Sequence, residues 1–372
     1  MRMKLLFLLL LVSCSALSQT YYMFIGTYTN AGSKGIYVYK FNASTGKAEW
    51  ISNTEGLVNP SYLAIAPNKK FIFAVTETAR ENAGSVSSFS FDRSSGKLTF
   101  ISKQQSGGDN PCYVTVSKNN NWICVANYSG GSLSAFPVDA DGSLQPFSQL
   151  IQHTGTGANK QRQEKAHVHS TVFSPAQDYV FSPDLGLDKV FIYKFDPSAK
   201  EPLQPAMQPF AQSQPGRGPR HFTFHPNNQY AYLIEEMGGT VVAYKYKNGT
   251  LDFVQSIATH PDDFKGDIGS ADIHISSDGK FLYASNRGDE NTITIFSIDS
   301  KTGKLTLKGY QSTKGKTPRN FIIDPTDNYL LVANQQTNNI VIFKRDRQSG
   351  LLKETGDEIK VPNPVCIQMM KE

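Results

Sequence analysis

A strand pattern repeats along almost the whole chain of 372 residues. Each copy has alternating hydrophobic residues, a short polar turn and a second apolar run, and the copies begin at residues 59, 110, 167, 218, 269, 317 and 363. The intervals are 51, 57, 51, 51, 48 and 46 residues, which is about the length of one four-stranded propeller blade. Seven copies therefore predict seven blades.

The clearest copy occupies residues 218–251. Phe222 and Phe224 alternate with polar residues, and apolar runs follow at residues 230–234 and 241–246, separated by Asn-Asn and Gly-Gly turns. This pattern indicates three strands joined by tight turns. Such a piece cannot bury both of its faces alone and needs neighbours like itself. We therefore predict an all-β fold, a single seven-bladed β-propeller over residues 19–372.

The two ends of the chain complement each other. Residues 363–370 have only an inner-strand pattern, whereas residues 23–47 have the pattern of a blade that lacks its inner strand. We predict that the C-terminal strand pairs with the N-terminal strands. This pairing would close the ring and remove its open edge.

Residues 1–18 have the features of a signal peptide. Arg2 and Lys4 precede an apolar run that is too short to span a bilayer, and small residues follow it. We expect a protein without a transmembrane span that is exported, periplasmic or secreted, after removal of residues 1–18. The alternative is a lipid anchor at Cys14, which would leave only a short tether before Tyr21.

Charge and cysteine content give further limits. Loss of residues 1–18 lowers the formal net charge from +5 to +3, which gives no electrostatic footprint for a nucleic acid. Cys112, Cys124 and Cys366 remain, each within a strand pattern. Their odd number leaves at least one thiol free, and we interpret them as small apolar core residues. We expect a monomer.

Charged residues at the starts of the inner strands are the first indication of a site. In the aligned copies, the second and third positions after the first residue include His169, Arg220, His221, Asp272 and Arg319. Inner strands begin at the mouth of the central channel, so these side chains are predicted to converge on one pocket. The alternative is that some of them brace neighbouring blades.

A second polar set stands at the ends of the second strands: Glu77, Asn127, Asp184, Glu235, Glu236, Asn286, Arg287 and Asn334. We expect the asparagines to cap turns through hydrogen bonds to the backbone. Glu236 and Arg287 are different, because a charge buried between blades must be paired or used.

The connection at residues 147–166 is unusually long. It contains Arg162 and leads directly into His167 and His169. We predict that it forms part of the entrance wall. The chain has no GxSxG elbow, no HExxH motif and no Gly-rich phosphate loop, so neither covalent serine chemistry nor zinc hydrolysis is indicated.

Six segments together resemble the seven-bladed propeller lactonases. They are GTYT (26–29), RQEKAHVHS (162–170), PDLGLDKV (183–190), GPRHFTFHPNNQYAYLIEE (218–236), ADIHISSDGKFLYASNRG (271–288) and TPRNFIIDPTDNYLLVAN (317–334). This family includes propeller-type 6-phosphogluconolactonases and is similar to the fungal carboxymuconate-lactonising enzymes. The resemblance implies a lactonase for 6-phosphogluconolactone or a related aldonolactone, without metal or other cofactor.

The resemblance also implies a catalytic set of His169, Arg220, Glu236 and Arg287. His169 is the candidate base because histidine titrates near neutrality, and Glu236 would orient it. Arg220 and Arg287 would bind the oxyanion or an anionic group of the substrate. We expect Arg220→Ala to lower turnover far more than stability. The remaining charged positions are assigned to substrate binding: His167, His221, Arg319, Asp272, Arg162 and Asp184.

Two features depart from the family pattern. The second strand of the fourth copy ends in Glu235-Glu236, where relatives usually have Asn-Glu. Export is the larger departure, since a sugar phosphate made in the cytoplasm is not an obvious substrate for an exported enzyme.

Two other functions remain open. A calcium-dependent lactonase could use the oxygen atoms of Glu77, Asn127, Asp184 and Asn286. A non-enzymatic propeller could bind a glycan or protein partner in the cell envelope, since fold alone does not fix function.

Overall fold

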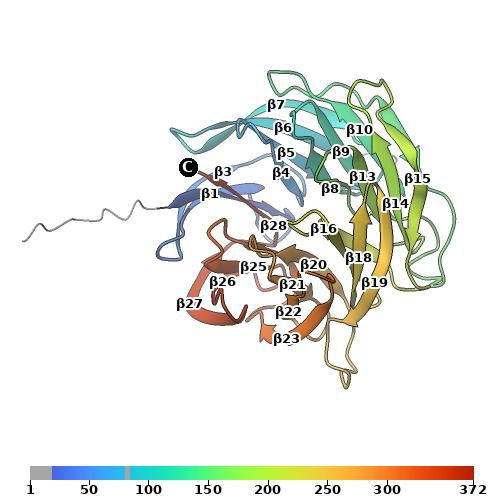
Figure 1. The fold of residues 1–372 in the computed structure, drawn as a ribbon. Helices are drawn as coiled ribbons and strands as arrows, with labels where there is room; N and C mark the ends of the chain where they lie inside the picture. Colours follow the sequence, from blue (N-terminus) through green and yellow to red (C-terminus); the bar gives the residue numbers. More distant parts are fainter. Residues whose placement is uncertain (1–18, 80–83) are drawn as a thin grey trace, which may run out of the picture.

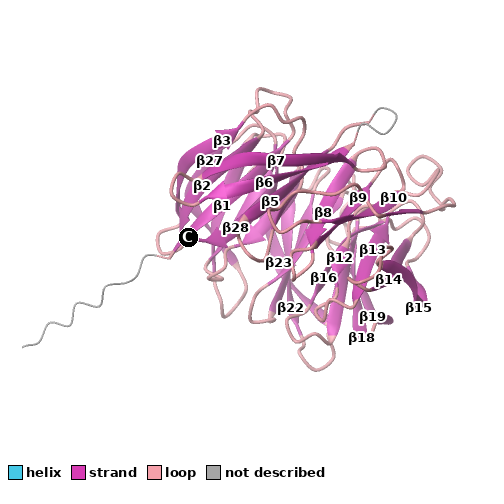
Figure 2. Cartoon of the chain, turned by 90° about the horizontal axis from the view of Figure 1, so that it is seen from above, coloured by secondary structure: helices cyan, strands magenta, loops and turns pink. Residues whose placement is uncertain are grey.

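The computed structural model describes residues 19–79 and 84–372. These residues form seven four-stranded antiparallel sheets, and Figure 1 shows the sheets arranged as blades around a common centre. The regular elements are strands, joined by turns and loops (Figure 2). The prediction of an all-β propeller with seven blades is confirmed. Within the described part of the chain, no helix is long and apolar enough to cross a membrane.

Each blade has an inner and a second strand beside the channel. In chain order of the blades, the inner strands are β28 (Pro364–Lys371), β4 (Leu63–Ile65), β8 (Pro111–Val116), β12 (Val172–Phe173), β16 (Pro219–Phe224), β20 (Ser270–Ile275) and β24 (Pro318–Ile323). The second strands are β1 (Thr20–Thr27), β5 (Phe71–Thr76), β9 (Trp122–Asn127), β13 (Tyr179–Asp184), β17 (Tyr230–Glu235), β21 (Phe281–Asn286) and β25 (Tyr329–Asn334).

Two further strands complete each blade on the outside. The third strands are β2 (Ile36–Asn42), β6 (Ser85–Asp92), β10 (Ser132–Pro137), β14 (Lys189–Phe195), β18 (Thr240–Lys247), β22 (Thr292–Ile298) and β26 (Asn339–Arg345). The outer strands are β3 (Lys47–Thr54), β7 (Lys97–Gln105), β11 (Gln149–Gln152), β15 (Leu203–Gln212), β19 (Thr250–Ala258), β23 (Leu305–Ser312) and β27 (Leu352–Lys360).

The ring closes between the two ends of the described chain, as predicted. The C-terminal strand β28 pairs antiparallel with β1 in the order β28-β1-β2-β3, and the two strands lie side by side in Figure 1. Ile367 of β28 is buried in a cluster with residues of the first and seventh blades. The closing strand therefore joins two blades by packing as well as by backbone hydrogen bonds.

Apolar contacts between adjacent blades make up the core. Phe181 of the fourth blade stacks on Phe222 of the fifth with ring centroids 5.3 Å apart, and similar clusters lie at the other blade junctions. Cys112, Cys124 and Cys366 are buried free thiols, as the sequence indicates. One strand was missed: Gln149–Gln152, which the sequence assigns to the long connection, pairs with β10 as the outer strand of its blade.

Candidate active site

The first residues of several inner strands are bulged. Pro219 and His221 pair with consecutive residues of β17, so Arg220 is an extra residue between them. Arg319 of β24 and Cys112 of β8 occupy the same position. A β-bulge re-aims a side chain and is common beside active sites. The bulge turns the side chain at this position away from the direction that regular strand pairing would give it.

A second set of side chains comes from the residue that directly follows a second strand. In an antiparallel hairpin, the start of the inner strand and the end of the second strand lie at the same end. Both sets therefore meet at one mouth of the channel. The second set comprises Tyr28, Glu77, Tyr128, Glu236 and Arg287.

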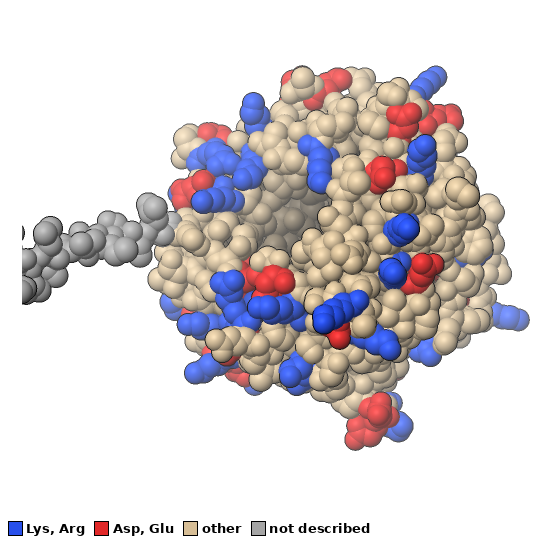
Figure 3. Space-filling view, in the orientation of Figure 1, with Lys and Arg blue, Asp and Glu red and all other residues tan. Residues whose placement is uncertain are grey.

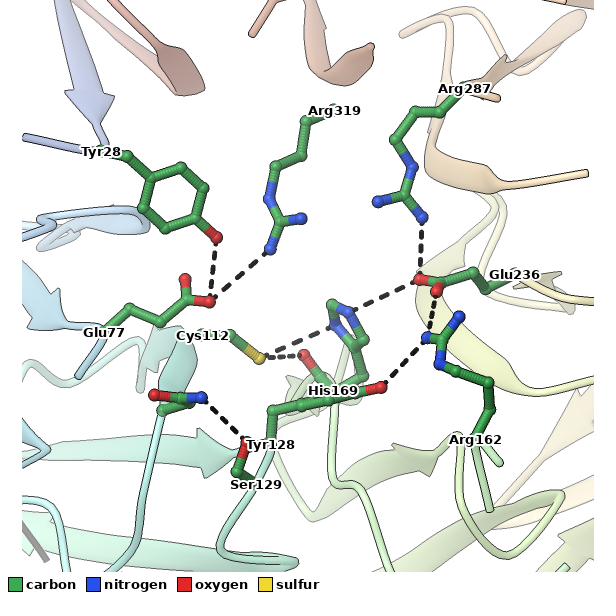
Figure 4. A pocket seen from close by; sticks show the side chains of 11 residues that line it. Tyr28, Glu77, Cys112, Tyr128, Ser129, Arg162, His169, Glu236, Arg287 and Arg319 are labelled. Atoms are coloured by element: carbon green, nitrogen blue, oxygen red, sulfur yellow. Dashed lines mark hydrogen bonds and ion pairs between the residues drawn. The ribbon is translucent and has the colours of Figure 1, made fainter. Parts of the chain in front are cut away.

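All members of the two sets except Arg220 line a cavity of about 350 Å³, which is within the range of small-molecule sites. The lining residues are Tyr28, Glu77, Asn110, Cys112, Tyr128, Ser129, Arg162, His169, Glu236, Arg287 and Arg319. Glu77 and Glu236 lie on opposite sides, with His169 between them (Figure 4). One face of the molecule is hollowed near the centre of the ring, with cations and carboxylates interspersed around it (Figure 3).

Glu236 is the centre of one side of the cavity. Its Oε1 lies 2.7 Å from Nη2 of Arg162, and its Oε2 lies 3.0 Å from Nε of Arg220 and 2.9 Å from Nη2 of Arg287. Burial alone would raise the pKa of Glu236, but Arg287, Arg220, His169 and Arg162 outweigh it and hold that pKa well below its usual range. Glu236 is therefore a carboxylate at neutral pH.

His169 shares this side of the cavity. Its Nε2 lies 3.9 Å from Oε2 of Glu236, and its Nδ1 lies 3.8 Å from Sγ of Cys112. Burial, together with the charge of Arg220, lowers the pKa of His169 well below its ordinary value. The imidazole is therefore neutral at pH 7, which is the form that can accept a proton.

Arg220 does not line this cavity and is almost completely buried. It borders a small adjoining void, together with His169 and His221. His221 donates from Nδ1 to Asp272 (2.7 Å), and its Nε2 accepts from Nη1 of Arg220 (3.2 Å). Burial and Arg220 lower the pKa of His221 to about 4, so it is neutral in this chain of contacts. His221 and Asp272 thus support Arg220 and do not line the main cavity.

The opposite side of the cavity is built around Glu77. Tyr28 donates its hydroxyl to Oε1 of Glu77 at 2.9 Å, and Ser61 donates to Oε2. Nη2 of Arg319 lies 3.8 Å from the same carboxylate, and its guanidinium lies over the Tyr28 ring at 5.4 Å.

The long connection places Arg162 on the cavity, where the sequence predicts an entrance wall. Gln163 fastens it by donating to the carbonyl of Leu185 at 2.8 Å, and Lys165 donates to the carbonyl of Ser129 at 2.6 Å. These bonds hold Arg162 in place beside Glu236.

His167 and Asp184 lie behind the wall. His167 stacks on Tyr128 with ring centroids 4.6 Å apart and donates from Nδ1 to the Tyr128 carbonyl. Asp184 accepts from the backbone N–H of His167 at 2.8 Å and pairs with Nδ1 of His153 at 2.7 Å. Neither side chain lines the cavity.

The oxygen atoms suggested for calcium belong to separate networks. Asn127 donates to the carbonyl of Ser106 and Asn286 to that of Thr259, so these asparagines bond to the backbone as expected. Over residues 19–79 and 84–372, no group of three or more His, Cys, Asp or Glu side chains is arranged to hold a metal ion.

Sequence reasoning missed Tyr28, Tyr128 and the position of Cys112 at the cavity. The second polar set was aligned one residue out of step: Glu77 follows its strand, as Tyr128 does, whereas Asn127 ends its strand. Counting from the last apolar residue of each second strand would have placed Tyr128 in the same set as Glu77 and Glu236, whereas Tyr28 lies one residue further from Ile25.

The similarities to known proteins agree with this geometry. Residues 22–369 match the model of the family "Lactonase, 7-bladed beta-propeller". A 6-phosphogluconolactonase of Formosa agariphila is 40% identical over 352 residues, covering 93% of this chain and 99% of the relative. The crystal structure of a candidate 6-phosphogluconolactonase of Bacteroides fragilis has a TM-score of 0.91 and 42% identity, covering 96% of this chain and 99% of that one.

A third relative is the periplasmic gluconolactonase of Pseudomonas aeruginosa. Its structure has a TM-score of 0.90 and 37% identity, covering 94% of this chain and 99% of that one. These relatives confirm the resemblance and identify the protein as a lactone-hydrolysing enzyme, a carboxylic-ester hydrolase, in preference to a non-enzymatic platform. The chain belongs to the lactonase family of seven-bladed β-propellers.

Proposed function

We propose that the protein hydrolyses a sugar lactone, 6-phosphogluconolactone or a related aldonolactone, by metal-independent activation of water at the channel mouth. The observation that carries this proposal is the convergence of His169, Arg220 and Arg287 on one carboxylate oxygen of Glu236. A neutral base and a fixed anion thus stand together at the wall of a cavity that suits a sugar ring. The names of the relatives support the class of substrate.

His169 acts as the general base. Its Nε2 and Oε2 of Glu236 are 3.9 Å apart, so one water molecule can contact both atoms. The water donates one hydrogen to Glu236 and the other to Nε2, and its oxygen faces the cavity. As this oxygen attacks the lactone carbonyl carbon, the imidazole takes its proton.

The arginines give the cavity an excess of positive charge. Among the residues that the structure describes, its lining holds Arg162, Arg287 and Arg319 and two carboxylates, Glu77 and Glu236. Such a field attracts a phosphorylated lactone and stabilises the negative charge that develops on the carbonyl oxygen. Arg220 adds to this positive field, although it does not line the cavity. The same positive field also favours binding of the carboxylate product until the product exchanges with solvent.

We further propose that residues 1–18 direct export; they lie outside the described residues, as does the alternative anchor Cys14. The periplasmic gluconolactonase of Pseudomonas aeruginosa supports both export and an unphosphorylated substrate. An exported enzyme would meet free gluconolactone more readily than its cytoplasmic 6-phosphate.

A direct test compares lactones with the purified protein lacking residues 1–18. Proton release is followed on gluconolactone, on its 6-phosphate and on an unsubstituted six-membered lactone, with the spontaneous rate subtracted. We expect catalysed opening of at least one sugar lactone and a much lower kcat/KM for the unsubstituted ring. Catalysis of the unsubstituted ring alone would contradict a sugar substrate.

A further inference from the structure

Arg319 differs from the other arginines of the site in its hydrogen bonds. Arg162, Arg220 and Arg287 each contact Glu236 and also donate to a second protein group. The Arg319 side chain, in contrast, makes no hydrogen bond with any residue that the structure describes. A guanidinium carries five N–H donors, so all the donors of Arg319 remain uncommitted, whereas each of the other three arginines commits at least two.

Arg319 is nevertheless held in place. Its guanidinium lies over the ring of Tyr28 at 5.4 Å, and Nη2 is 3.8 Å from Oε1 of Glu77. Tyr28 is fixed in turn, because its hydroxyl donates to Glu77. The Arg319 side chain is 20% exposed. A cation that is positioned by a ring face and an ion pair, with free donors in a cavity, is suited to receive an anion.

Its place relative to His169 identifies that anion. Both residues line the main cavity and also the small adjoining void. Figure 4 shows the Arg319 guanidinium extending into the cavity beside Glu77, on the same side of His169 as Cys112. A lactone whose carbonyl carbon faces the His169 side therefore has its carbonyl oxygen within the reach of Arg319.

We propose that Arg319 binds the carbonyl oxygen of the lactone and the oxyanion formed from it, and that Tyr28 and Glu77 are positioning residues for Arg319. This proposal rests on the lactonase function proposed above. It assigns the oxyanion to Arg319, whose donors are all free, and leaves Arg220 and Arg287 to hold Glu236.

The water oxygen forms a bond to the carbonyl carbon while His169 accepts the water proton, and the carbonyl π electrons move onto the oxygen, where Arg319 donates hydrogen bonds. On collapse, the C=O bond reforms, the bond to the ring oxygen breaks, and the imidazolium returns its proton to that oxygen. The product acid then ionises and releases one proton to solvent.

The test uses Arg319→Ala and Arg319→Lys in the full mature chain, with Arg347→Ala at an exposed position as the matched control. Initial rates are measured on gluconolactone and on its 6-phosphate. We expect kcat of Arg319→Ala to fall about a hundredfold or more on both substrates, with KM changed less than about threefold. Arg319→Lys should keep only part of the rate, since an ammonium lacks the planar fork. The control should match the wild type.

Other outcomes would overturn the proposal in recognisable ways. A rise in KM for the 6-phosphate alone would make Arg319 a phosphate ligand. If Arg319→Ala lost thermal stability in proportion to its loss of kcat, the role of Arg319 would be structural. Addition of guanidinium at concentrations that do not denature the protein should restore part of the Arg319→Ala rate, and no rescue in a folded variant would count against the proposal. Wild-type protein without any lactonase activity would instead refute the proposed function.

Discussion

Nε of Arg220 lies 3.0 Å from Oε2 of Glu236, although sixteen residues separate them in the chain. Arg220 stands at the start of β16 and Glu236 directly after β17, so the hairpin returns the chain to the same end of the blade. Both side chains are buried. Breaking a buried pair by removing one partner commonly costs about 3–5 kcal/mol. The pair therefore links the stability of the fifth blade to the site.

This burial changes what is expected of Arg220→Ala. The variant leaves Glu236 with one cation fewer and the Ala271 carbonyl without its donor, so we expect lower stability as well as lower turnover. Arg287 is a cleaner probe, because its side chain is 16% exposed. Arg287→Ala should lower kcat/KM about tenfold or more and change the midpoint of urea unfolding little. Equal losses of rate and stability in Arg287→Ala would contradict a role in the site.

The pH dependence of kcat/KM tests His169. Activity requires its neutral form, and burial with Arg220 lowers its pKa well below the ordinary 6.5. Activity should therefore persist as pH falls through 6.5 and be lost only at more acidic pH, because protonation removes the base. The measurement is the initial rate at a series of pH values with the spontaneous rate subtracted. An acid limb centred at or above pH 6.5 would contradict the assignment.

The blades and the ring closure were predictable because a 51-residue repeat with alternating apolar residues has few ways to bury its faces. The site was predictable only in part. Arg220 and His221 are neighbours in sequence, yet the bulge sends one toward Glu236 and the other toward Asp272. Periodicity does not reveal a bulge, so both were assigned to substrate binding or catalysis.

The prediction for the long connection at residues 147–166 was limited in a different way. Arg162 was assigned to substrate binding and does reach the cavity, whereas nearby His167 turns behind the wall onto Tyr128. Strand periodicity gives no direction for residues in a loop, because their orientation depends on individual hydrogen bonds such as that of Gln163.

Ring closure can be tested with Ile367→Ala. Ile367 is 1% exposed and packs between the first and seventh blades, so we expect a loss of about 2–5 kcal/mol in the free energy of unfolding. Urea denaturation measures it. Met207→Ala is the control, since Met207 is fully exposed on an outer strand and should change stability by about 0.5 kcal/mol or less. Equal losses of stability in Ile367→Ala and Met207→Ala would contradict the role of β28 in closing the ring.

Chelation tests metal independence. Asn127 and Asn286, suggested as calcium ligands, are engaged with the backbone in separate blades. We therefore expect exhaustive treatment with a chelator to leave kcat unchanged. Loss of activity that calcium restores would overturn this expectation.

Catalysed proton release from gluconolactone and its 6-phosphate, by wild-type protein and by His169→Gln, tests whether the protein is a lactonase with His169 as its base. The side chain of His169 is almost completely buried yet borders the cavity, and glutamine fills similar space without a titrating nitrogen. We predict catalysis by the wild type and a loss of about a hundredfold or more in kcat for the folded variant. A wild-type rate equal to the spontaneous one on both lactones, or a variant as active as the wild type, would contradict the central claim.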